Sequence, residues 1–165
     1  MSGMYAIYHG PQGIRRIAEQ IHQHTCVLAT SLTTAGYKIH SDIFFDTIRV
    51  MGPDNIVDKA RGSGINIRDF SDGTVGIALD ETVTVNDLKN LLTLFDTDHS
   101  QAADSVIPSD LQRQSAFLTH PVFNRFQSET EMLRYIHRLE TKDLSLNTSM
   151  IPLGSCTCLL YTSPS

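Results

Sequence analysis

Two loops of this sequence carry side chains that could do chemistry. In the first, Ser155, Cys156 and Thr157 follow Gly154, and glycine lets a backbone come close to a ligand. Loop amides with hydroxyl and thiol groups are suited to holding a carboxylate or a phosphate, and a serine or cysteine there could act as a nucleophile. A plain turn would have the same composition, so the residues leave both interpretations open.

The second loop contains His120 directly before Pro121. Proline restricts the backbone of the residue before it, which holds this histidine in a limited set of conformations. Such a histidine can form the wall of a ligand pocket, or it can pack within its own loop. Near the beginning of the chain, Tyr5 and Tyr8 stand at helical spacing with Met4, a pattern more typical of a core than of a ligand platform.

The seven histidines of the sequence do not suggest a metal site. His22 and His24 are two residues apart, so on a helix they point about 200° away from each other and cannot share a metal. Cys156 and Cys158 form a C-x-C pattern, but a structural zinc site needs a second ligand pair. We therefore expect no metal.

A cofactor held as a Schiff base needs a lysine that faces a ligand. The sequence has four lysines: Lys38 at the start of a predicted strand, Lys59 and Lys89 on amphipathic helices, and Lys142 at a helix end. We expect all four to be solvated surface charges.

The elements that would position these groups follow from apolar periodicity. Helical spacing of apolar residues after Pro11 predicts a long amphipathic helix that ends at Gly36. Alternation over residues 43–50 predicts a strand, and residues 54–61 suit a short helix.

Two more strands and a third helix complete this part of the chain. Ile65 to Ile67 and Val75 to Leu79 alternate as strands do, with the turn signal Asp72-Gly73 between them. Thr84 and Asp87 form a capping pattern before an apolar stripe that reaches Phe95. The order helix, strand, helix, strand, strand, helix predicts a small α+β unit, with an antiparallel sheet and its helices on one face.

The rest of the chain has weaker patterns. Residues 96–114 lose apolar periodicity and are expected to form a connector. Ser128 and Glu131 form a capping box before a helix predicted from Glu129 to about Leu144, and residues 150–157 are expected to form a loop.

Composition limits the class of protein. With 165 residues, 41% hydrophobic and 19% charged, the chain has the length and character of about one soluble globular domain. A net charge of -5 leaves no positive excess for nucleic acid, and no apolar run approaches the roughly 20 residues that span a bilayer. The opening MSGMYAIYHG lacks signal-peptide features, and three sparse cysteines fit reduced thiols in the cytosol or mitochondrial matrix.

Four strings of the sequence resemble, in order and with family-like spacing, the P-protein of the glycine cleavage system, the pyridoxal-phosphate-dependent glycine dehydrogenase (decarboxylating) family. They are MYAIYHGPQG at 4–13, LTHPVFNR at 118–125, SETEMLRY at 128–135 and MIPLGSCT at 150–157. The resemblance runs from about residue 1 to Thr157. It departs at Gln127, where the family more often has histidine, and over residues 158–165, which resemble translated adapter or frameshifted sequence.

This resemblance implies a far longer parent with two related halves, each similar to the fold-type-I pyridoxal phosphate enzymes. Residues 1–96 would then be the end of the first half, with its small C-terminal-type α+β domain starting at about residue 11. Residues 97–114 would be the connector and residues 115–157 the start of the second half. Residues 158–165 would be an artefactual tail.

The resemblance also implies that the parent decarboxylates glycine with pyridoxal phosphate as electron sink and passes the aminomethyl group to the lipoyl arm of H-protein. In proteins of this family only the second half carries the Schiff-base lysine. No lysine here matches it, so we expect this chain alone to be inactive. Ser155, Cys156, Thr157 and His120 would form at most part of the pocket rim.

The partners expected from the resemblance are glycine, lipoyl-bearing H-protein and the other half of the same enzyme, as a homodimer or as paired subunits. The location would be the cytoplasm in a bacterium and the mitochondrion in a eukaryote. Two other interpretations remain open. Residues 37–95 alone could be a small α+β ligand-binding or regulatory module without catalysis, or the segment could only pack on the rest of its parent.

Overall fold

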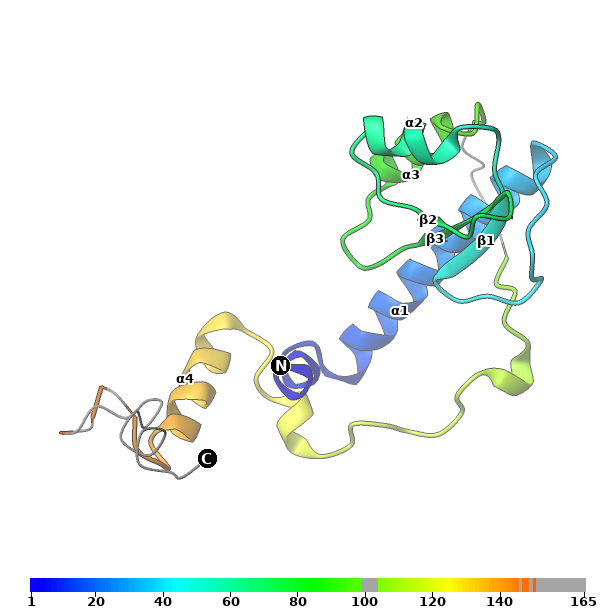
Figure 1. Cartoon of the computed structure of the whole chain (residues 1–165). Coiled ribbons are helices and arrows are strands. Elements are labelled where there is room, and N and C mark those ends of the chain that lie inside the picture. Colours follow the sequence, from blue (N-terminus) through cyan, green and yellow to red (C-terminus); the bar gives the residue numbers. More distant parts are fainter. Residues whose placement is uncertain (99–103, 146, 149, 151–165) are drawn as a thin grey trace, which may run out of the picture. The chain divides into compact units, whose positions relative to one another are not determined.

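The computed structural model describes residues 1–98, 104–145, 147–148 and 150 (Figure 1). They form two compact units. The terminal unit contains Met1–Gln12 and the described residues from Ala116 onward, and the central unit is Gly13–Ser115.

The first helix, α1 (Ser2–Thr34), belongs to both units and is broken at Gly10, whose backbone is not helical (φ 64°, ψ 178°). Pro11 therefore begins the second of the two helices that meet at this break, which confirms the predicted helix start, although helical residues also precede the break. The predicted stop is confirmed. Gly36 takes a φ of 91° and donates its N–H to the carbonyl of Thr33, while Tyr37 donates to Leu32. This paired arrangement satisfies two carbonyls at the helix end.

The central unit contains a three-stranded antiparallel sheet of order β1-β3-β2. The predicted antiparallel type of the sheet is confirmed. Its strands are β1 (Thr47–Met51), β2 (Arg68–Asp69) and β3 (Thr74–Ala78). The turn between β2 and β3 uses Gly73 at a φ of 79°, which explains the glycine of the predicted turn.

Two strand boundaries differ from the sequence prediction. The strand expected from residue 43 begins only at Thr47, because the carbonyl of Phe45 accepts a hydrogen bond from a histidine ring of α1. Residues 65–67 are not a strand, and β2 follows them. The amide of Ile65 is held by the carbonyl of Ala60 at the end of the preceding helix, so pairing with β3 starts at Arg68.

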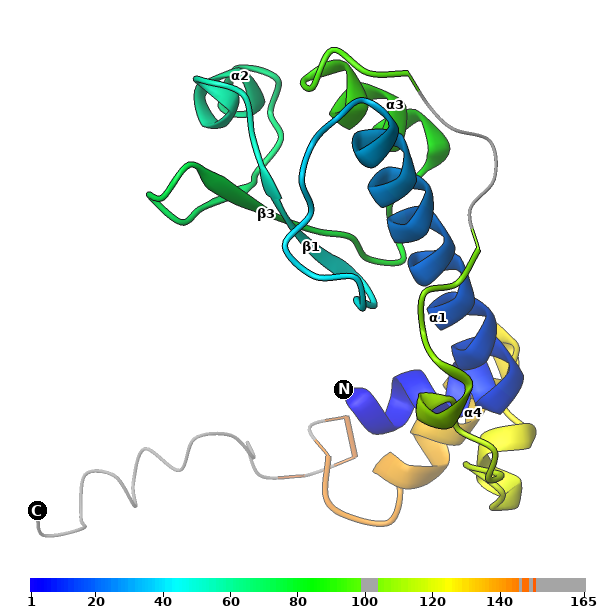
Figure 2. The same ribbon diagram turned by 90° about the vertical axis from the view of Figure 1, so that its right-hand side faces the viewer.

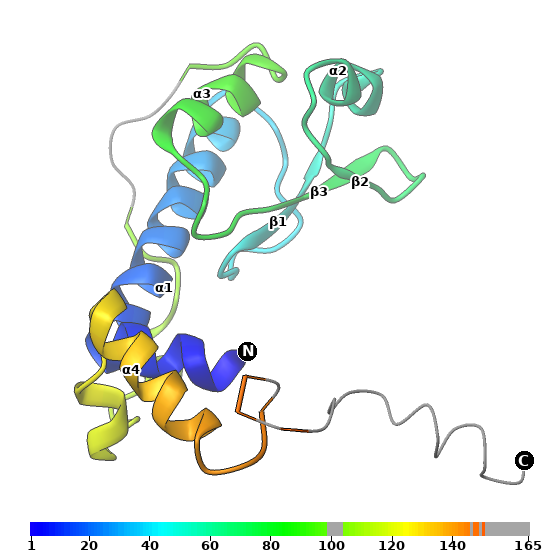
Figure 3. The same cartoon turned by 90° about the vertical axis from the view of Figure 1, so that its left-hand side faces the viewer.

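The core of the central unit lies between the sheet and three helices. Helices α2 (Ile56–Gly62) and α3 (Val85–Thr93) join the second half of α1 on one face of the sheet, as predicted, and α1 and α3 lie side by side in Figures 2 and 3. The buried cluster comprises Leu28, Ala29, Leu32, Ile48, Val50, Ile56, Ala60, Val75, Ile77, Leu79, Leu88, Leu91, Leu92, Leu94 and Phe95. Because β1 and β3 alternate buried and outward residues, only one face of the sheet contributes to this cluster.

The terminal unit contains a 3-10 turn at Pro121–Asn124 and helix α4 (Glu129–Glu140). The hydroxyl of Ser128 accepts a hydrogen bond from the amide of Glu131, which is one half of the predicted capping box. The predicted end at Leu144 is wrong, because short-range turns after Glu140 replace helical bonding. Tyr5 is 40% exposed, so its predicted core position is also not observed.

A second 3-10 turn, Ser109–Leu111, lies in the predicted connector and has no buried residue. No helix in the described part of the chain has the length and apolar character that crossing a membrane requires. The predicted loop from residue 151 to Thr157 and the tail 158–165 lie outside the described residues.

Candidate functional site

His120 is the one predicted site residue that the structure describes, and it begins the Pro121–Asn124 turn of the terminal unit. Its carbonyl accepts the amide N–H of Phe123 at 3.1 Å, and its ring Nδ1 accepts the N–H of Val122 at 3.2 Å. The side-chain amide of Asn124 donates to the carbonyls of Leu118 (3.2 Å) and His120 (3.3 Å). The loop is therefore fixed by its own polar groups.

The bond to Val122 determines which nitrogen of the neutral His120 ring carries the proton. Because a backbone N–H can only donate, Nδ1 accepts and the proton of the neutral ring resides on Nε2. The residue is exposed while its ring bonds within its own loop, so both interpretations of His120 stay open. Chemically, the ring can stack on a flat ligand or donate one hydrogen bond from Nε2.

The N-terminal segment of α1 lies against this loop within the terminal unit. A Cβ atom built on Gly10 would lie 2.3 Å from Nε2 of Gln127 and 2.8 Å from the carbonyl oxygen of Phe123. Only glycine fits both this close approach and the φ of 64°. Gln127, one of the positions where a departure from the resembled family is predicted, is therefore in direct contact with the break in α1.

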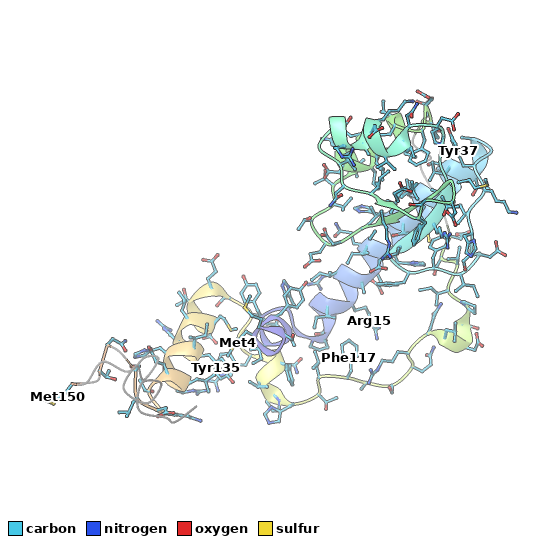
Figure 4. The ribbon with its side chains drawn as sticks, viewed as in Figure 1. Met4, Arg15, Tyr37, Phe117, Tyr135 and Met150 are labelled. Carbon is cyan, nitrogen blue, oxygen red and sulfur yellow. The ribbon has the colours of Figure 1, made fainter. Side chains whose placement is uncertain are left out.

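Several aromatic rings of the terminal unit contact one another. His9 lies 4.3 Å from Tyr5 and 5.2 Å from Tyr8, measured between ring centroids. Phe126, which is buried, stacks on Tyr135 of α4 at 4.3 Å. Figure 4 shows the side chains of this unit, with Tyr135 labelled on its helix. The unit therefore presents histidine and tyrosine rings that could contact a planar ligand.

Ser155, Cys156 and Thr157 lie outside the described residues. Their predicted place beside His120 at a pocket rim stays a prediction.

Sequence reasoning missed a polar cluster in the central unit. His22 is buried on α1; its Nδ1 bonds the carbonyl of Phe45 at 3.0 Å and its Nε2 bonds the hydroxyl of Ser105 at 2.9 Å. The sulfur of Cys26 lies 3.4 Å from Nε2, and the ring of Phe45 stacks on the imidazole. The signal was available in part, since residues 22 and 26 are four apart on one helical face.

This cluster does not suit nucleophilic catalysis. Cys26 is only 1% exposed, and burial raises the pKa of its thiol, whereas a reactive cysteine needs a lowered pKa. The carbonyl of Phe45 can only accept, so Nδ1 carries the proton and Nε2 is left to accept from hydroxyl and thiol. The cluster joins α1 to two segments that are distant in sequence.

The lysines are exposed, as predicted. Lys59 forms a surface ion pair with Asp96 at 3.8 Å, and Lys38, Lys89 and Lys142 also lie at the surface. A Schiff-base lysine requires a pocket that favours its neutral form, so these residues do not fit as the covalent holder of an aldehyde cofactor. Among the described side chains, no three histidine, cysteine, aspartate or glutamate residues gather as metal ligands would.

Comparison with known proteins shows the family. The family model described as "Glycine cleavage system P-protein" matches residues 1–95, which is more than half of the chain. This chain belongs to the glycine cleavage system P-protein family.

Curated relatives agree over nearly the whole chain. Glycine dehydrogenase (decarboxylating) of Thermosynechococcus vestitus is 50% identical over 97% of this chain. The proteins of the same name from Nostoc punctiforme and Edwardsiella ictaluri are 49% and 46% identical, again over 97% of the chain. The chain spans only 17% to 18% of the length of these relatives.

Proposed function

We propose that this chain is a segment of a glycine dehydrogenase that decarboxylates glycine and transfers the aminomethyl group to lipoylated H-protein. The observation that carries the proposal is the 50% identity to the Thermosynechococcus vestitus protein over 97% of the chain. That identity extends past Gln114, a part of the chain that a small regulatory module made of residues 37–95 would not need.

Within the parent, the segment would close the first of two related halves, each of the fold-type-I pyridoxal phosphate architecture. The α+β unit with its three-stranded antiparallel sheet is compatible with the small domain of such a half. Residues 1–96 would end the first half, 97–114 would connect the halves, and 115–157 would open the second, with residues 158–165 as an artefactual tail.

In the parent, pyridoxal phosphate would supply the electron sink for loss of carbon dioxide from glycine. Its lysine would lie outside these 165 residues, because all four lysines here are exposed to solvent. The role of this chain would be to shape the pocket rim through His120 and Ser155 to Thr157. H-protein and the other half of the enzyme, in a homodimer or in paired subunits, would be its partners, in the cytoplasm of a bacterium or the mitochondrion of a eukaryote.

A segment exchange tests the proposal. Residues 1–150 of this chain replace the matching segment of the Thermosynechococcus vestitus protein, and the chimera is assayed with glycine, pyridoxal phosphate and lipoylated H-protein. We expect release of carbon dioxide from the carboxyl of glycine, dependent on all three components. A second chimera carrying His120→Ala tests the rim. We expect this variant to have a lower kcat/KM for glycine and unchanged thermal stability.

The matched control is the unmodified relative, purified and assayed in parallel. A chimera that folds like this control, retains bound cofactor and yet releases no carbon dioxide would contradict the proposed function of the segment.

A further inference from the structure

One cavity of the central unit lies where the β2 side of the sheet opens. It has a volume of about 550 Å³, within the range of roughly 300–1,000 Å³ that ligand pockets span. Its walls come from the chain before β2, the end of β3 and one side of α3, and it is lined in part by Ile65, Asn66, Ile67, Ala78 and Asn90.

Backbone pairing stops at this cavity. The β2–β3 ladder pairs Arg68 with Gly76 and Asp69 with Val75, and the same register would next place Asn66 opposite Ala78. Within the described residues, no backbone hydrogen bond joins these two, and both line the cavity. The ladder therefore ends one rung before the strand β3 does.

The backbone groups of Ala78, which bond no other backbone group in the described part of the chain, face the cavity side of β3. Phe70 donates its N–H to the carbonyl of Thr74, so positions 74, 76 and 78 point their N–H and C=O groups toward β2. Leu79 donates instead to Asp46 beside β1, which confirms the alternation. Ala78 thus offers a donor and an acceptor that the sheet does not use.

Most side chains around this opening are apolar, although Ser63, Asn66, Asp87, Asn90 and Thr93 also line it. Ile77, Leu79, Leu88 and Leu91 are buried at its floor, and Ile65, Ile67 and Val83 are half-buried where they pack on the core. An extended peptide satisfies such a site in both respects, because it pairs its backbone with a strand edge and places alternate side chains into a pocket.

We propose that this opening receives an extended segment of the P-protein chain that lies outside these 165 residues, paired with Ala78 and placing an apolar side chain into the cavity. More than four-fifths of the length of the relatives lies outside this chain and can supply that segment. A second copy is a poorer occupant, because every strand in the described part of the chain is already paired within this sheet. The inference rests on family membership and not on the reaction.

Hydrogen–deuterium exchange tests the proposal on the 165-residue chain and on the chimera with the Thermosynechococcus vestitus protein. The amides of Asn66 and Ala78 should exchange rapidly in the chain alone and at least about tenfold more slowly in the chimera. The amide of Ile77, whose residue pairs with Ile48 of β1, serves as internal reference and should be protected in both.

Two variants of α3 distinguish an inserted segment from direct pairing of Asn66 with Ala78. Asn90→Trp narrows the cavity from an exposed position of the helix. Lys89→Trp places the same ring on the exposed position one residue earlier, which does not line the cavity. In the chimera, N90W should abolish the protection of Ala78 and K89W should keep it.

Three outcomes would overturn the proposal: equal exchange of Ala78 in chain and chimera, protection that N90W leaves intact, or protection in the chain alone that disappears on dilution and so identifies a second copy. A chimera that protects Ala78 but does not act on glycine would contradict the proposed function and leave the docked segment standing.

Discussion

Gly10 shows how one residue can determine the terminal unit. Its φ of 64° and ψ of 178° are open to glycine alone, and the space for a Cβ is filled by atoms of Phe123 and Gln127. The Gly-Pro pair was visible in the sequence as the boundary of a helix. The approach of Gln127 from more than one hundred residues away was not.

Gly10→Ala should destabilise the terminal unit by about 1–3 kcal/mol, because strain in the backbone adds to the collision with Phe123 and Gln127. The measurement is amide exchange over α4 in the 165-residue chain. Gly3→Ala is the matched control, since a Cβ at Gly3 meets nothing within 4 Å. An equal effect of the two substitutions would show that the loop does not close on Gly10.

Asp87 makes the central unit sensitive to acid. Hydrogen bonds from the side chain and then the backbone of Thr84 lower the pKa of this carboxyl below its usual value, as both cap α3. The unfolded state binds the proton more readily, so the capping contribution is present above about pH 4 and is lost as the pH falls through the lower folded pKa.

Asp87→Asn should therefore lower the thermal midpoint at pH 7, and the difference from the parent chain should shrink at pH 3. Circular dichroism on heating measures both. Asp54→Asn removes another exposed carboxyl that does not cap a helix, and it should leave the midpoint at pH 7 unchanged. A D87N difference that stays constant between pH 7 and pH 3 would contradict the assignment.

The exposed lysines lead to a prediction about the cofactor. The 165-residue chain mixed with pyridoxal phosphate should form no stoichiometric imine, because its four lysines are exposed to solvent and a stable Schiff base needs a lysine held in a pocket. Borohydride reduction followed by peptide mass spectrometry measures the adduct. Modification concentrated on a single lysine would show that a pocket exists there, whereas low and scattered labelling fits the structure.

Local signals in the sequence predicted most elements of the central unit. The Thr84 and Asp87 capping box and the Gly36 stop involve residues within a few positions of one another. The hydrogen bonds that form them can therefore be predicted from a short stretch of sequence. The position of β2 was not predictable in this way. Two residues carry no periodicity, and their pairing depends on Gly76 across the turn.

Long-range contacts explain the rest of what the sequence did not reveal. His22 and Ser105 are 83 positions apart, and neither residue type announces the bond that joins them. Likewise, the outer face of the sheet carries Phe70 with the guanidinium groups of Arg49 and Arg68 at 4.3 and 4.9 Å from the ring centroid. Gly76 beneath it leaves room for the ring, since a Cβ there would lie 3.0 Å from Phe70.

Helix α4 exposes an apolar stripe in this chain. Leu133 is 67% and Ile136 is 42% exposed, beside the half-buried Met132 and Leu139. Contiguous apolar surface of this kind promotes association when nothing covers it.

Leu133→Glu should therefore reduce self-association of the 165-residue chain without loss of helix, as measured by light scattering across a concentration series. Arg134→Gln makes the same change in net charge on the opposite side of the helix and is the matched control. If both variants reduce association equally, charge and not the stripe is responsible.

The two units differ in charge as well as in packing. Counted along the sequence, the central unit has 9 Lys and Arg against 14 Asp and Glu, and the terminal unit has 4 of each. The whole net charge of -5 thus resides in the central unit. This charge favours partners that are neutral or basic.

The central unit should fold without the terminal unit. All fifteen buried residues of its core lie between Leu28 and Phe95, and its three strands pair with one another and, at Val50, with Ile39 of the same unit. Residues 13–115 produced alone should therefore protect the amides of Val50 and Ile77 as the 165-residue chain does.

Residues 13–98 form the informative comparison, because they keep the core but lack Ser105 and leave the buried Nε2 of His22 without its hydroxyl partner. Loss of that partner should make the shorter segment less stable by about 1–3 kcal/mol in urea denaturation. Equal stability of the two segments would show that the Ser105 contact contributes nothing, and absence of protection in both would show that the central unit needs the terminal unit to fold.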